Sequence, residues 1–223
     1  MSSAATARPQ HIGVFGGAFD PPHQAHVALA QAALAQLALD ALHIVPTGQA
    51  WHKKRELSAA ADRLAMVRLA FAGLDRVVVD EREIQRAGPS FTVDTLEALQ
   101  AEHPGAQLYL LMGADQFAAL PSWHRWQDVL KLAIICIAGR AGGARATAQF
   151  DPQFSGEAPV LTLQLPLMPV SATDIRQQIA APVTGQPGWH TLVPEPVARY
   201  IERHQLYLSS GNPFPHFIEA NPA

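Results

Sequence analysis

Short apolar runs alternate with longer stretches of helical spacing along most of the chain. The runs are rich in Val, Ile and Leu, and most of them end at Gly, Pro or Asp. Near-continuous apolar runs are typical of parallel strands that are buried on both faces. We therefore expect strands at residues 11–17, 42–48, 76–84, 107–115, 132–140 and 160–166.

The stretches between these runs have the spacing of amphipathic helices. Leu64, Val67 and Phe71, for example, fall on one face of a helix predicted at 58–73. Further helices are expected at 26–39, 90–105, 171–179 and 195–207. Strands that alternate with helices form βαβ units with right-handed crossovers. The pattern predicts an α/β fold: a doubly wound parallel sheet with a small helical part near the C-terminus.

Length and composition are those of one domain. The chain has 223 residues, and 48% of them belong to the apolar class, which suffices for a large core. We expect a flexible tail at 1–10, a single domain at 11–208 and an irregular tail at 209–223. Neither a monomer nor a homodimer is favoured.

Charge and cysteine content argue against several kinds of partner. Charged residues make up 16% of the chain and the formal net charge is −3, which does not favour nucleic acid or an anionic membrane. The single cysteine, Cys136, forms no internal disulfide, and we interpret it as a small buried hydrophobe. The first ten residues lack the apolar core of a signal peptide, and polar residues interrupt the apolar stretch 25–45. We therefore expect a cytoplasmic protein.

Unusual residues gather directly after the predicted strands, where open α/β sheets bind their ligands. The stretches concerned are GGAFDPPHQAH (16–26), PTGQAWHKK (46–54), DEREIQRAGPSFT (80–92), GADQ (113–116) and the dipeptide at 139–140. The carboxyl ends of parallel strands meet at one edge of the sheet, so these stretches are expected to form one site.

The stretch GGAFDPPHQAH is typical of a phosphate site. Gly16 and Gly17 have no Cβ and allow a ligand to lie close to the backbone. The two prolines set φ where a helix can begin, which places His23 and His26 on its first turn. The N–H groups of a helix N-terminus bind phosphate, and two imidazoles there can donate hydrogen bonds to it. We interpret the stretch as a site that stabilises charge on phosphorus rather than as a nucleophile.

Three other interpretations of this stretch are weaker. A dinucleotide-binding turn requires G-x-G-x-x-G, which this stretch lacks. A zinc site of the protease type requires two histidines four residues apart with a glutamate, and this pattern is also missing. A plain turn with two solvated histidines does not account for the glycines, the prolines and the preceding strand together.

The second candidate phosphate site is PVSATDIR, residues 169–176. Ser171 can cap a helix, and Asp174, three residues further on, completes a capping box. Arg176 lies about one turn into this helix, where its guanidinium can hold two phosphate oxygens. Alone this is an ordinary capped helix. Together with the two histidines it predicts a polyphosphate site.

The two motifs together resemble those of the nucleotidyltransferases with an HxGH signature and a late SSTxxR-type motif, which have a Rossmann-like fold. Within that family the chain is similar to the bacterial nicotinate-nucleotide adenylyltransferases. The similarity covers about residues 12–207 and rests on GGAFDPPHQAH, PTGQAWHKK, RAGPSFTVDTLEAL, LLMGADQFAALPSWHRW, VSATDIR and LVPEPVARYIERHQLY. The chain departs from the family at Ala25, where HxGH has its glycine, and at Ala172, where the late motif has its second serine.

The resemblance implies that His23, His26 and Arg176 are the catalytic residues. The histidines bind the ATP phosphates and stabilise charge at the α-phosphorus, while Arg176 with Ser171 holds the β,γ end. Mg²⁺ is expected to bridge the phosphates with few protein ligands, so we expect no dedicated protein metal site. Asp20 is equally well explained as an aspartate that stabilises the turn. The residues expected to bind ATP are Gly16, Gly17, Phe19, Asp20, His23, His26, Asp115, Ser171, Thr173 and Arg176.

The resemblance also implies that nicotinate mononucleotide is the second substrate. Trp123 is expected to be the platform for the pyridine ring, and backbone N–H groups near Phe91 and Thr92 to bind its carboxylate. An amide in place of the carboxylate would direct N–H toward N–H, which favours nicotinate over nicotinamide. The candidates for binding the mononucleotide phosphate are Lys53, Arg86 and Arg140. Each of these three is also explained as a solvated surface charge.

The leading hypothesis is therefore adenylyl transfer from ATP to nicotinate mononucleotide in NAD biosynthesis. The same chemistry on nicotinamide mononucleotide or on phosphopantetheine stays open, as does a non-catalytic nucleotide-binding module. A redox enzyme with a dinucleotide cofactor is disfavoured by the missing glycine fingerprint.

Overall fold

The computed structural model describes residues 8–48, 57–140, 160–166, 168–181 and 188–208. Its strands are β1 (His11–Gly17), β2 (Ala41–Pro46), β3 (Val77–Val79), β4 (Gln107–Met112), β5 (Ala133–Arg140) and β6 (Val160–Leu165). Its α-helices are α1 (Gln24–Gln36), α2 (Ala60–Phe71), α3 (Arg82–Gln85), α4 (Thr92–Glu102), α5 (Ala114–Ala119), α6 (Trp126–Leu132), α7 (Ala172–Ala180) and α8 (Glu195–Arg203). Two 3-10 helices, η1 (Leu120–Ser122) and η3 (Trp189–Leu192), complete the described elements.

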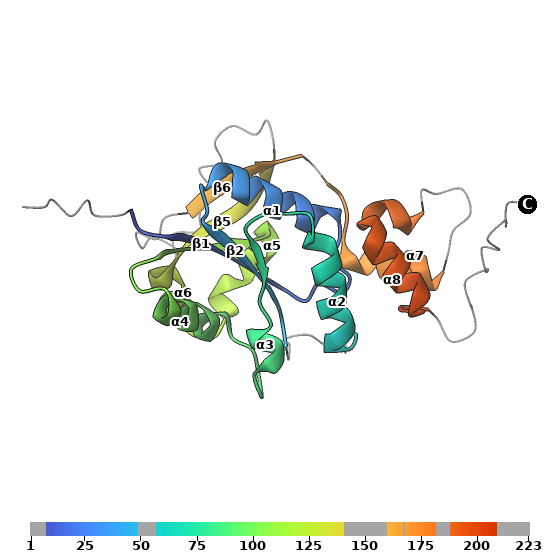
Figure 1. The fold of residues 1–223 in the computed structure, drawn as a ribbon, viewed down its shortest axis with the longest axis horizontal. Helices are drawn as coiled ribbons and strands as arrows, with labels where there is room; N and C mark the ends of the chain where they lie inside the picture. Colours follow the sequence, from blue (N-terminus) through green and yellow to red (C-terminus); the bar gives the residue numbers. More distant parts are fainter. Residues whose placement is uncertain (1–7, 49–56, 141–159, 167, 182–187, 209–223) are drawn as a thin grey trace, which may run out of the picture.

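The six strands form one parallel sheet in the order β3-β2-β1-β4-β5-β6 (Figure 1). The chain builds outward from β1 to β3, returns to the other side of β1 with β4, and builds outward again. This confirms the predicted doubly wound, Rossmann-like fold. The order reverses between β1 and β4, and ligands bind such sheets beyond the carboxyl ends of the strands at that point.

The structure differs from the predicted elements in three places. The third strand ends at Val79 rather than at residue 84, because Asp80 accepts a hydrogen bond from the Arg82 N–H (3.1 Å) and α3 begins there. The fourth strand ends at Met112 rather than at residue 115, and α5, η1 and α6 follow it in a stretch where no helix was predicted. The last helix ends at Arg203 rather than at residue 207, and Gln205 has a positive φ of 51°.

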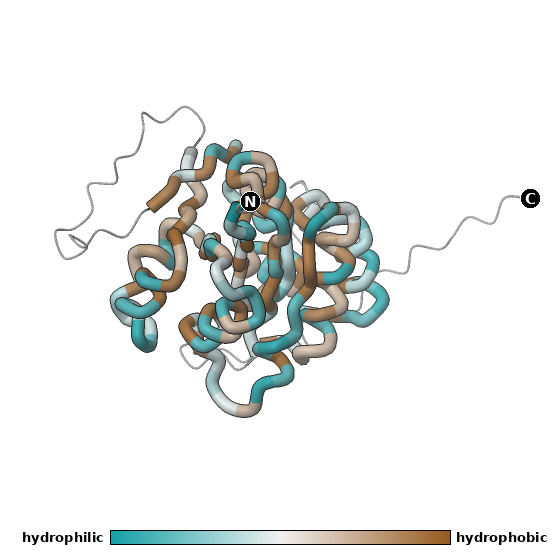
Figure 2. Tube along the Cα trace, turned by 60° about the vertical axis from the view of Figure 1, so that its left-hand side comes forward, coloured by the Kyte–Doolittle hydropathy of each residue, from teal (hydrophilic) through white to brown (hydrophobic). Residues whose placement is uncertain are grey.

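Each face of the sheet carries its own apolar layer. Leu108 and Leu110 of β4 belong to the layer beneath α4 and α6, while Tyr109 and Leu111 belong to the layer beneath α1 and α2. Successive strand residues point to opposite faces, which explains why the strands read as continuous apolar runs. Hydrophobic and hydrophilic residues are interspersed along the helices (Figure 2). Cys136 is fully buried, and burial raises the pKa of its thiol to about 12, which confirms its interpretation as a small core residue.

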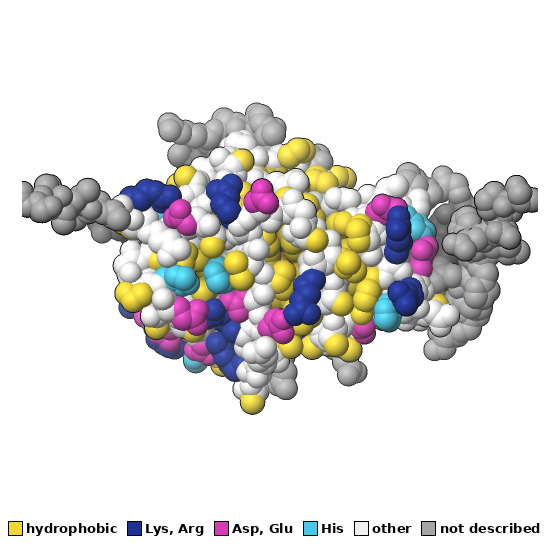
Figure 3. Space-filling model, viewed as in Figure 1, with side chains coloured by type: hydrophobic (Ala, Val, Ile, Leu, Met, Phe, Trp, Pro, Cys, Tyr) yellow, Lys and Arg dark blue, Asp and Glu magenta, His cyan; other side chains and the backbone are white. Residues whose placement is uncertain are grey.

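Few large apolar side chains reach the surface of the described part of the chain. Val78 and Leu161 are exposed on the two edge strands, and Leu69 is exposed on α2. Figure 3 shows hydrophobic side chains near α2, interspersed with charged ones. Among the described helices, none has the length and apolar character needed to cross a bilayer.

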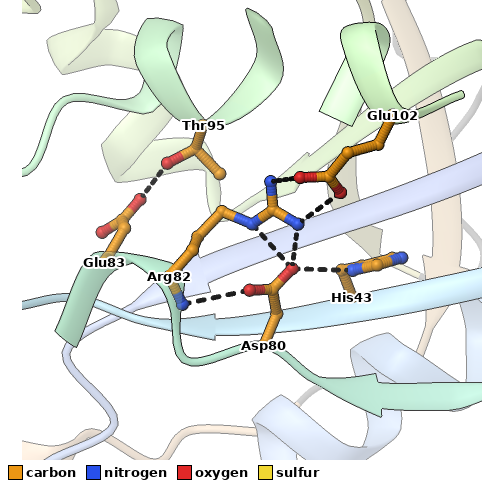
Figure 4. A network of polar contacts seen from close by, with 6 residues as sticks. All are labelled: His43, Asp80, Arg82, Glu83, Thr95 and Glu102. Atoms are coloured by element: carbon orange, nitrogen blue, oxygen red, sulfur yellow. Dashed lines mark hydrogen bonds and ion pairs between the residues drawn. The ribbon is translucent and has the colours of Figure 1, made fainter. Parts of the chain in front are cut away.

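A polar network joins β2, α3 and α4 on one side of the sheet (Figure 4). Asp80 accepts from Arg82 Nε (2.8 Å) and lies 2.9 Å from His43 Nδ1. Arg82 also forms a bidentate pair with Glu102 at the end of α4 (3.1 and 2.9 Å). Burial acts to raise the pKa of Asp80, but the hydrogen bonds from His43 and Arg82 outweigh it and lower that pKa to about 2. The network therefore stabilises the fold through an ionised Asp80.

We expect the contribution of Asp80 to stability to be lost in acid. Its pKa in the folded chain lies below the usual 3.8, so its contribution is present above about pH 4 and falls as the pH approaches 2. In the Asp80→Asn variant this pH-dependent contribution to stability should vanish. The difference in the free energy of unfolding between wild type and variant should therefore shrink by about 1 kcal/mol between pH 5 and pH 3. Urea titrations at each pH measure it, with Asp75→Asn, at an exposed aspartate before β3, as the control. A constant difference for Asp80→Asn would contradict the assignment.

Candidate active site

A cleft of about 1010 Å³ opens at the carboxyl ends of β1, β2, β4 and β5. The ends of the strands supply apolar side chains, and polar and aromatic side chains surround them, which is typical of ligand sites. The predicted site residues that line it are Gly16, Gly17, Phe19, Asp20, His23, His26, Phe91, Thr92, Asp115, Trp123, Ser171, Thr173 and Arg176. These residues come from both halves of the doubly wound sheet, and the cleft brings them to one place.

The two histidines are stacked at the start of α1. Their ring centroids lie 3.7 Å apart with an interplanar angle of 21°. His23 is the N-cap of the helix rather than a residue of its first turn, because its backbone is extended (φ −139°, ψ 174°). Its backbone N–H donates to His26 Nδ1 (3.1 Å), so a neutral His26 carries its proton on Nε2. Burial lowers the pKa of His23 to about 4, so this ring is neutral at physiological pH without a ligand.

Glycine and phenylalanine shape the loop that precedes the histidines. A Cβ on Gly17 would lie 3.2 Å from the Phe19 ring, whereas a Cβ on Gly16 would meet no atom within 4 Å. Gly16 therefore leaves open space where its side chain would be, and Gly17 allows Phe19 to fold back. Phe19 has a positive φ of 47° and packs edge-on against His26 at 5.0 Å, which holds that ring in place.

Asp20 anchors the same loop to two distant segments. Its side chain is 2% exposed, and its Oδ1 accepts a hydrogen bond from the Tyr207 hydroxyl (2.7 Å). Its Oδ2 accepts from the backbone N–H of Ser58 (3.2 Å). Burial, with the negative charge of Asp20, raises the pKa of the Tyr207 hydroxyl and keeps it a donor. These contacts are of the kind that a turn-stabilising aspartate makes.

The buried guanidinium of Arg63 supports this loop from α2. The side chain is 2% exposed, and its Nη1 donates to the carbonyl oxygens of Ala18 (3.0 Å) and Thr47 (2.7 Å). Its Nε donates to the Ser58 carbonyl (3.0 Å). Arg63 thereby ties together the segments that follow β1 and β2. Sequence reasoning missed this role, because bonds to backbone carbonyls leave no motif.

The second phosphate motif forms the N-terminus of α7. Ser171 is its N-cap and accepts a hydrogen bond from the Asp174 N–H (3.1 Å), while its own hydroxyl donates to the Asp174 carboxylate (2.7 Å). This confirms the predicted cap at Ser171, while the Asp174 carboxylate binds the Ser171 hydroxyl rather than its backbone N–H as a capping box would. Arg176 donates from Nη2 to Thr173 Oγ1 (3.1 Å) and from Nη1 to the carbonyl of Asp20 (2.6 Å). The bond from Arg176 to Asp20 joins the second phosphate motif directly to the first, GGAFDPPHQAH.

A third wall of the cleft is aromatic. Phe91 is the N-cap of α4, and its ring lies 4.4 Å from that of His124, tilted by 35°. Trp123 is partly buried and lines the cleft, whereas Trp126, also partly buried, does not. The wall therefore combines flat side chains with the N-terminus of α4 at Thr92.

Three predicted residues are not placed in the cleft. Arg86 does not line it, and its Nη1 lies 3.8 Å from Asp94 Oδ2 on the first turn of α4. Lys53 and the side chain of Arg140 lie outside the described part of the structure. Their predicted role with the mononucleotide phosphate stays a prediction.

The cleft also contains polar residues that sequence reasoning missed. They are Thr47, Glu83, Ser90, Thr95 and His124. The sequence pattern placed Glu83 in the third strand, so it did not predict that this residue lines the cleft. Thr95 was placed within a helix, but nothing in its neighbourhood marked it as polar and buried. Among the described residues, no group of three or more His, Cys, Asp or Glu side chains is arranged to hold a metal ion.

We expect His23 to titrate well below the usual range of a histidine in the ligand-free protein. Because its ring is buried, the charged form is disfavoured and the pKa falls to about 4. NMR of the imidazole signals against pH measures this, with His23→Asn to assign the resonance. Addition of inorganic triphosphate should raise this pKa, because a nearby anion favours the charged ring. Titration of His23 near pH 6.5 without ligand would refute the expected burial.

Comparison with known proteins agrees with this geometry. The family model described as cytidylyltransferase-like matches residues 14–178. A probable nicotinate-nucleotide adenylyltransferase of Albidiferax ferrireducens is 56% identical over 198 residues, 89% of this chain and 98% of the relative. A probable nicotinate-nucleotide adenylyltransferase of Methylibium petroleiphilum is 41% identical over 202 residues, which is 90% of this chain and 94% of the relative.

Solved structures show that the fold is shared more widely. The nicotinic acid mononucleotide adenylyltransferase of Plasmodium falciparum, complexed with NaAD, has a TM-score of 0.70 at 16% identity and covers 89% of this chain and 97% of its own. Its complex with APC has a TM-score of 0.68 at 17% identity with the same coverage. At such identities the likeness concerns the fold alone, whereas the curated relatives are similar enough to define a family. The chain belongs to the cytidylyltransferase-like family and groups within it with the nicotinate-nucleotide adenylyltransferases.

Proposed function

We propose that the chain transfers the adenylyl group of ATP to nicotinate mononucleotide and forms deamido-NAD and pyrophosphate. The observation that carries this proposal is the cleft in which two helix N-termini, two histidines and an arginine lie together. Such an arrangement suits a triphosphate, because it supplies N–H donors and positive charge from two sides. The aromatic third wall suits a second, ring-bearing substrate.

In the proposed reaction the 5′-phosphate of the mononucleotide attacks the α-phosphorus of ATP. A new P–O bond forms as the bond between the α-phosphorus and the bridging oxygen breaks, and pyrophosphate leaves. The attacking phosphate is already an anion, so no general base is needed and positioning dominates catalysis. His26 donates to the phosphate from Nε2, and the bound polyanion raises the pKa of the neutral His23.

The N-terminus of α7 would hold the leaving group. Ser171, Thr173 and Arg176 line the cleft, and Arg176 is already oriented by its bond to Asp20. Mg²⁺ bound to the phosphates would neutralise charge that develops on the leaving pyrophosphate. The residues fit an ion held chiefly by substrate, because the Asp20 carboxylate accepts bonds from Tyr207 and Ser58. Asp115, exposed in the first turn of α5, is the carboxylate that faces the cleft most openly.

The aromatic wall would bind the pyridine ring and its carboxylate. Trp123 supplies a flat apolar surface, and the backbone N–H groups at Phe91 and Thr92 point from the start of α4. A carboxylate accepts at both oxygens, whereas an amide presents N–H to these donors. Leaving such donors unpaired costs about 1–3 kcal/mol for each group. This favours nicotinate mononucleotide over its amide.

We expect pyrophosphate release from Mg-ATP with nicotinate mononucleotide and much slower release with nicotinamide mononucleotide. Parallel assays of released pyrophosphate measure both, and phosphopantetheine is the third substrate tested. Equal rates with both pyridine nucleotides would keep the chemistry and refute the carboxylate argument. No release with any of the three would favour a non-catalytic nucleotide-binding module.

We expect His26→Ala to lower turnover by about 100- to 1000-fold, as the loss of one donor to a transition-state oxyanion does in other enzymes. ATP affinity should stay within a few-fold, because the helix N-termini and Arg176 are retained. Steady-state kinetics and calorimetric titration with ATP separate the two effects. His204→Ala, which changes an exposed histidine beyond α8, is the control. Unchanged turnover in His26→Ala would overturn the catalytic assignment.

A further inference from the structure

Glu83 is a buried carboxyl on the wall of the cleft that the proposed reaction does not use. Its side chain lies on α3, is 6% exposed and faces the start of α4. Its Oε1 accepts a hydrogen bond from the Thr95 hydroxyl at 2.8 Å (Figure 4). Thr95 is 1% exposed and also lines the cleft. Burying two polar side chains costs free energy because water no longer solvates them, and their mutual hydrogen bond offsets part of that cost.

Contacts of Glu83 lie on both sides of the segment that begins α4. Its side chain binds Thr95, whose backbone N–H also donates to the Phe91 carbonyl (3.4 Å). Its main-chain carbonyl accepts from the Ser90 hydroxyl (3.4 Å), directly before Phe91. Glu83 therefore holds the residues that flank Phe91 and Thr92, the segment with the N–H groups proposed to bind the carboxylate.

Glu83 is itself held from the opposite direction. A Cβ on Gly48 would lie 2.0 Å from the Glu83 carbonyl oxygen, so the loop after β2 packs directly against this residue. Any residue other than glycine at that position would push α3 away. Glu83 is thus fixed between the loop after β2 and the start of α4.

The charge of Glu83 matters because a carboxylate substrate is expected nearby. Burial raises the pKa of Glu83, while the Thr95 hydrogen bond and the charge of Arg86 oppose this. A raised pKa means that this buried carboxyl ionises less readily than an exposed one.

We propose that Glu83 and Thr95 are positioning residues that set the orientation of Phe91 and Thr92 and thereby the preference for a pyridine carboxylate over an amide. The proposal rests on the proposed function of the cleft. It assigns no contact between Glu83 and the substrate. The pair acts through the backbone at the start of α4.

The other end of the same two helices provides a matched control. Arg82, next to Glu83 on α3, pairs with Glu102 at the last residue of α4, and neither lines the cleft. Loss of that ion pair loosens the contact between α3 and α4 without changing the residues beside Phe91. If Glu83 and Thr95 had only a structural role, loss of the contact at either end of α4 would change the kinetic constants in the same way.

The test compares Thr95→Val, Thr95→Ser and Glu102→Ala with the wild type. Thr95→Val keeps the shape and removes the hydroxyl, so we expect the KM for nicotinate mononucleotide to rise about tenfold while the KM for ATP stays within twofold. The ratio of kcat/KM for the nicotinate and nicotinamide forms should fall by a similar factor. Thr95→Ser, which keeps the donor, should restore both quantities. Glu102→Ala should lower the melting temperature and leave both quantities unchanged.

Several results would overturn the proposal. Equal rises in both KM values for Thr95→Val, or the same kinetic change in Glu102→Ala, would show a general structural role. If Thr95→Val does not fold, the double variant Glu83→Gln/Thr95→Val, which also removes the buried charge, takes its place with the same expectations. Failure of the proposed function is distinguishable, because the wild type would then release no pyrophosphate with nicotinate mononucleotide.

Discussion

The hydrogen bond from Arg176 to the carbonyl oxygen of Asp20, 156 residues earlier in the chain, joins two helix N-termini. One N-terminus follows β1 and carries the stacked histidines, and the other begins α7 with its serine cap. Asp20 is in turn bound by Tyr207 beyond α8 and by the backbone of Ser58 before α2. The geometry of the phosphate site therefore depends on segments from the beginning, the middle and the end of the described chain.

Preorganisation of this kind gives the site its electrostatic character. The chain as a whole has a formal net charge of −3, so long-range attraction does not draw ATP to it. The attraction comes instead from local donors, which are the N–H groups of α1 and α7, the guanidinium of Arg176 and the imidazole of His26. Because Phe19, Asp20 and Arg63 hold these groups before a ligand arrives, little reorganisation is needed when charge develops on phosphorus.

Sequence patterns predicted the sheet and most of the cleft. The runs that form β1 and β4 are apolar on both faces, and the turn residues after them are chemically unusual, so their place at the carboxyl edge follows from topology. The cap of α7 at Ser171 was also predictable, because a serine directly before a helical pattern is a local signal. The Rossmann-like order of the strands then brought these local signals together.

Other features depend on contacts that leave no local signal. Arg63 and Arg176 bind backbone carbonyls, and any residue can supply a carbonyl. Glu83 was hidden because the charged residues after Val79 were assigned to the strand, whereas an Asp80 side-chain bond starts a helix there. The neutral state of His23 follows from its burial in the folded chain, and a motif does not report burial.

The central claim is that ATP lies between the two helix N-termini with the mononucleotide against the aromatic wall. A crystal structure with a non-hydrolysable ATP analogue, Mg²⁺ and nicotinate mononucleotide tests it most directly. The account predicts the α-phosphate beside His26, the β- and γ-phosphates at the start of α7 near Arg176, and the pyridine carboxylate at the N–H groups of Phe91 and Thr92. A triphosphate bound away from α7, or a pyridine ring outside the wall formed by Phe91 and Trp123, would contradict it.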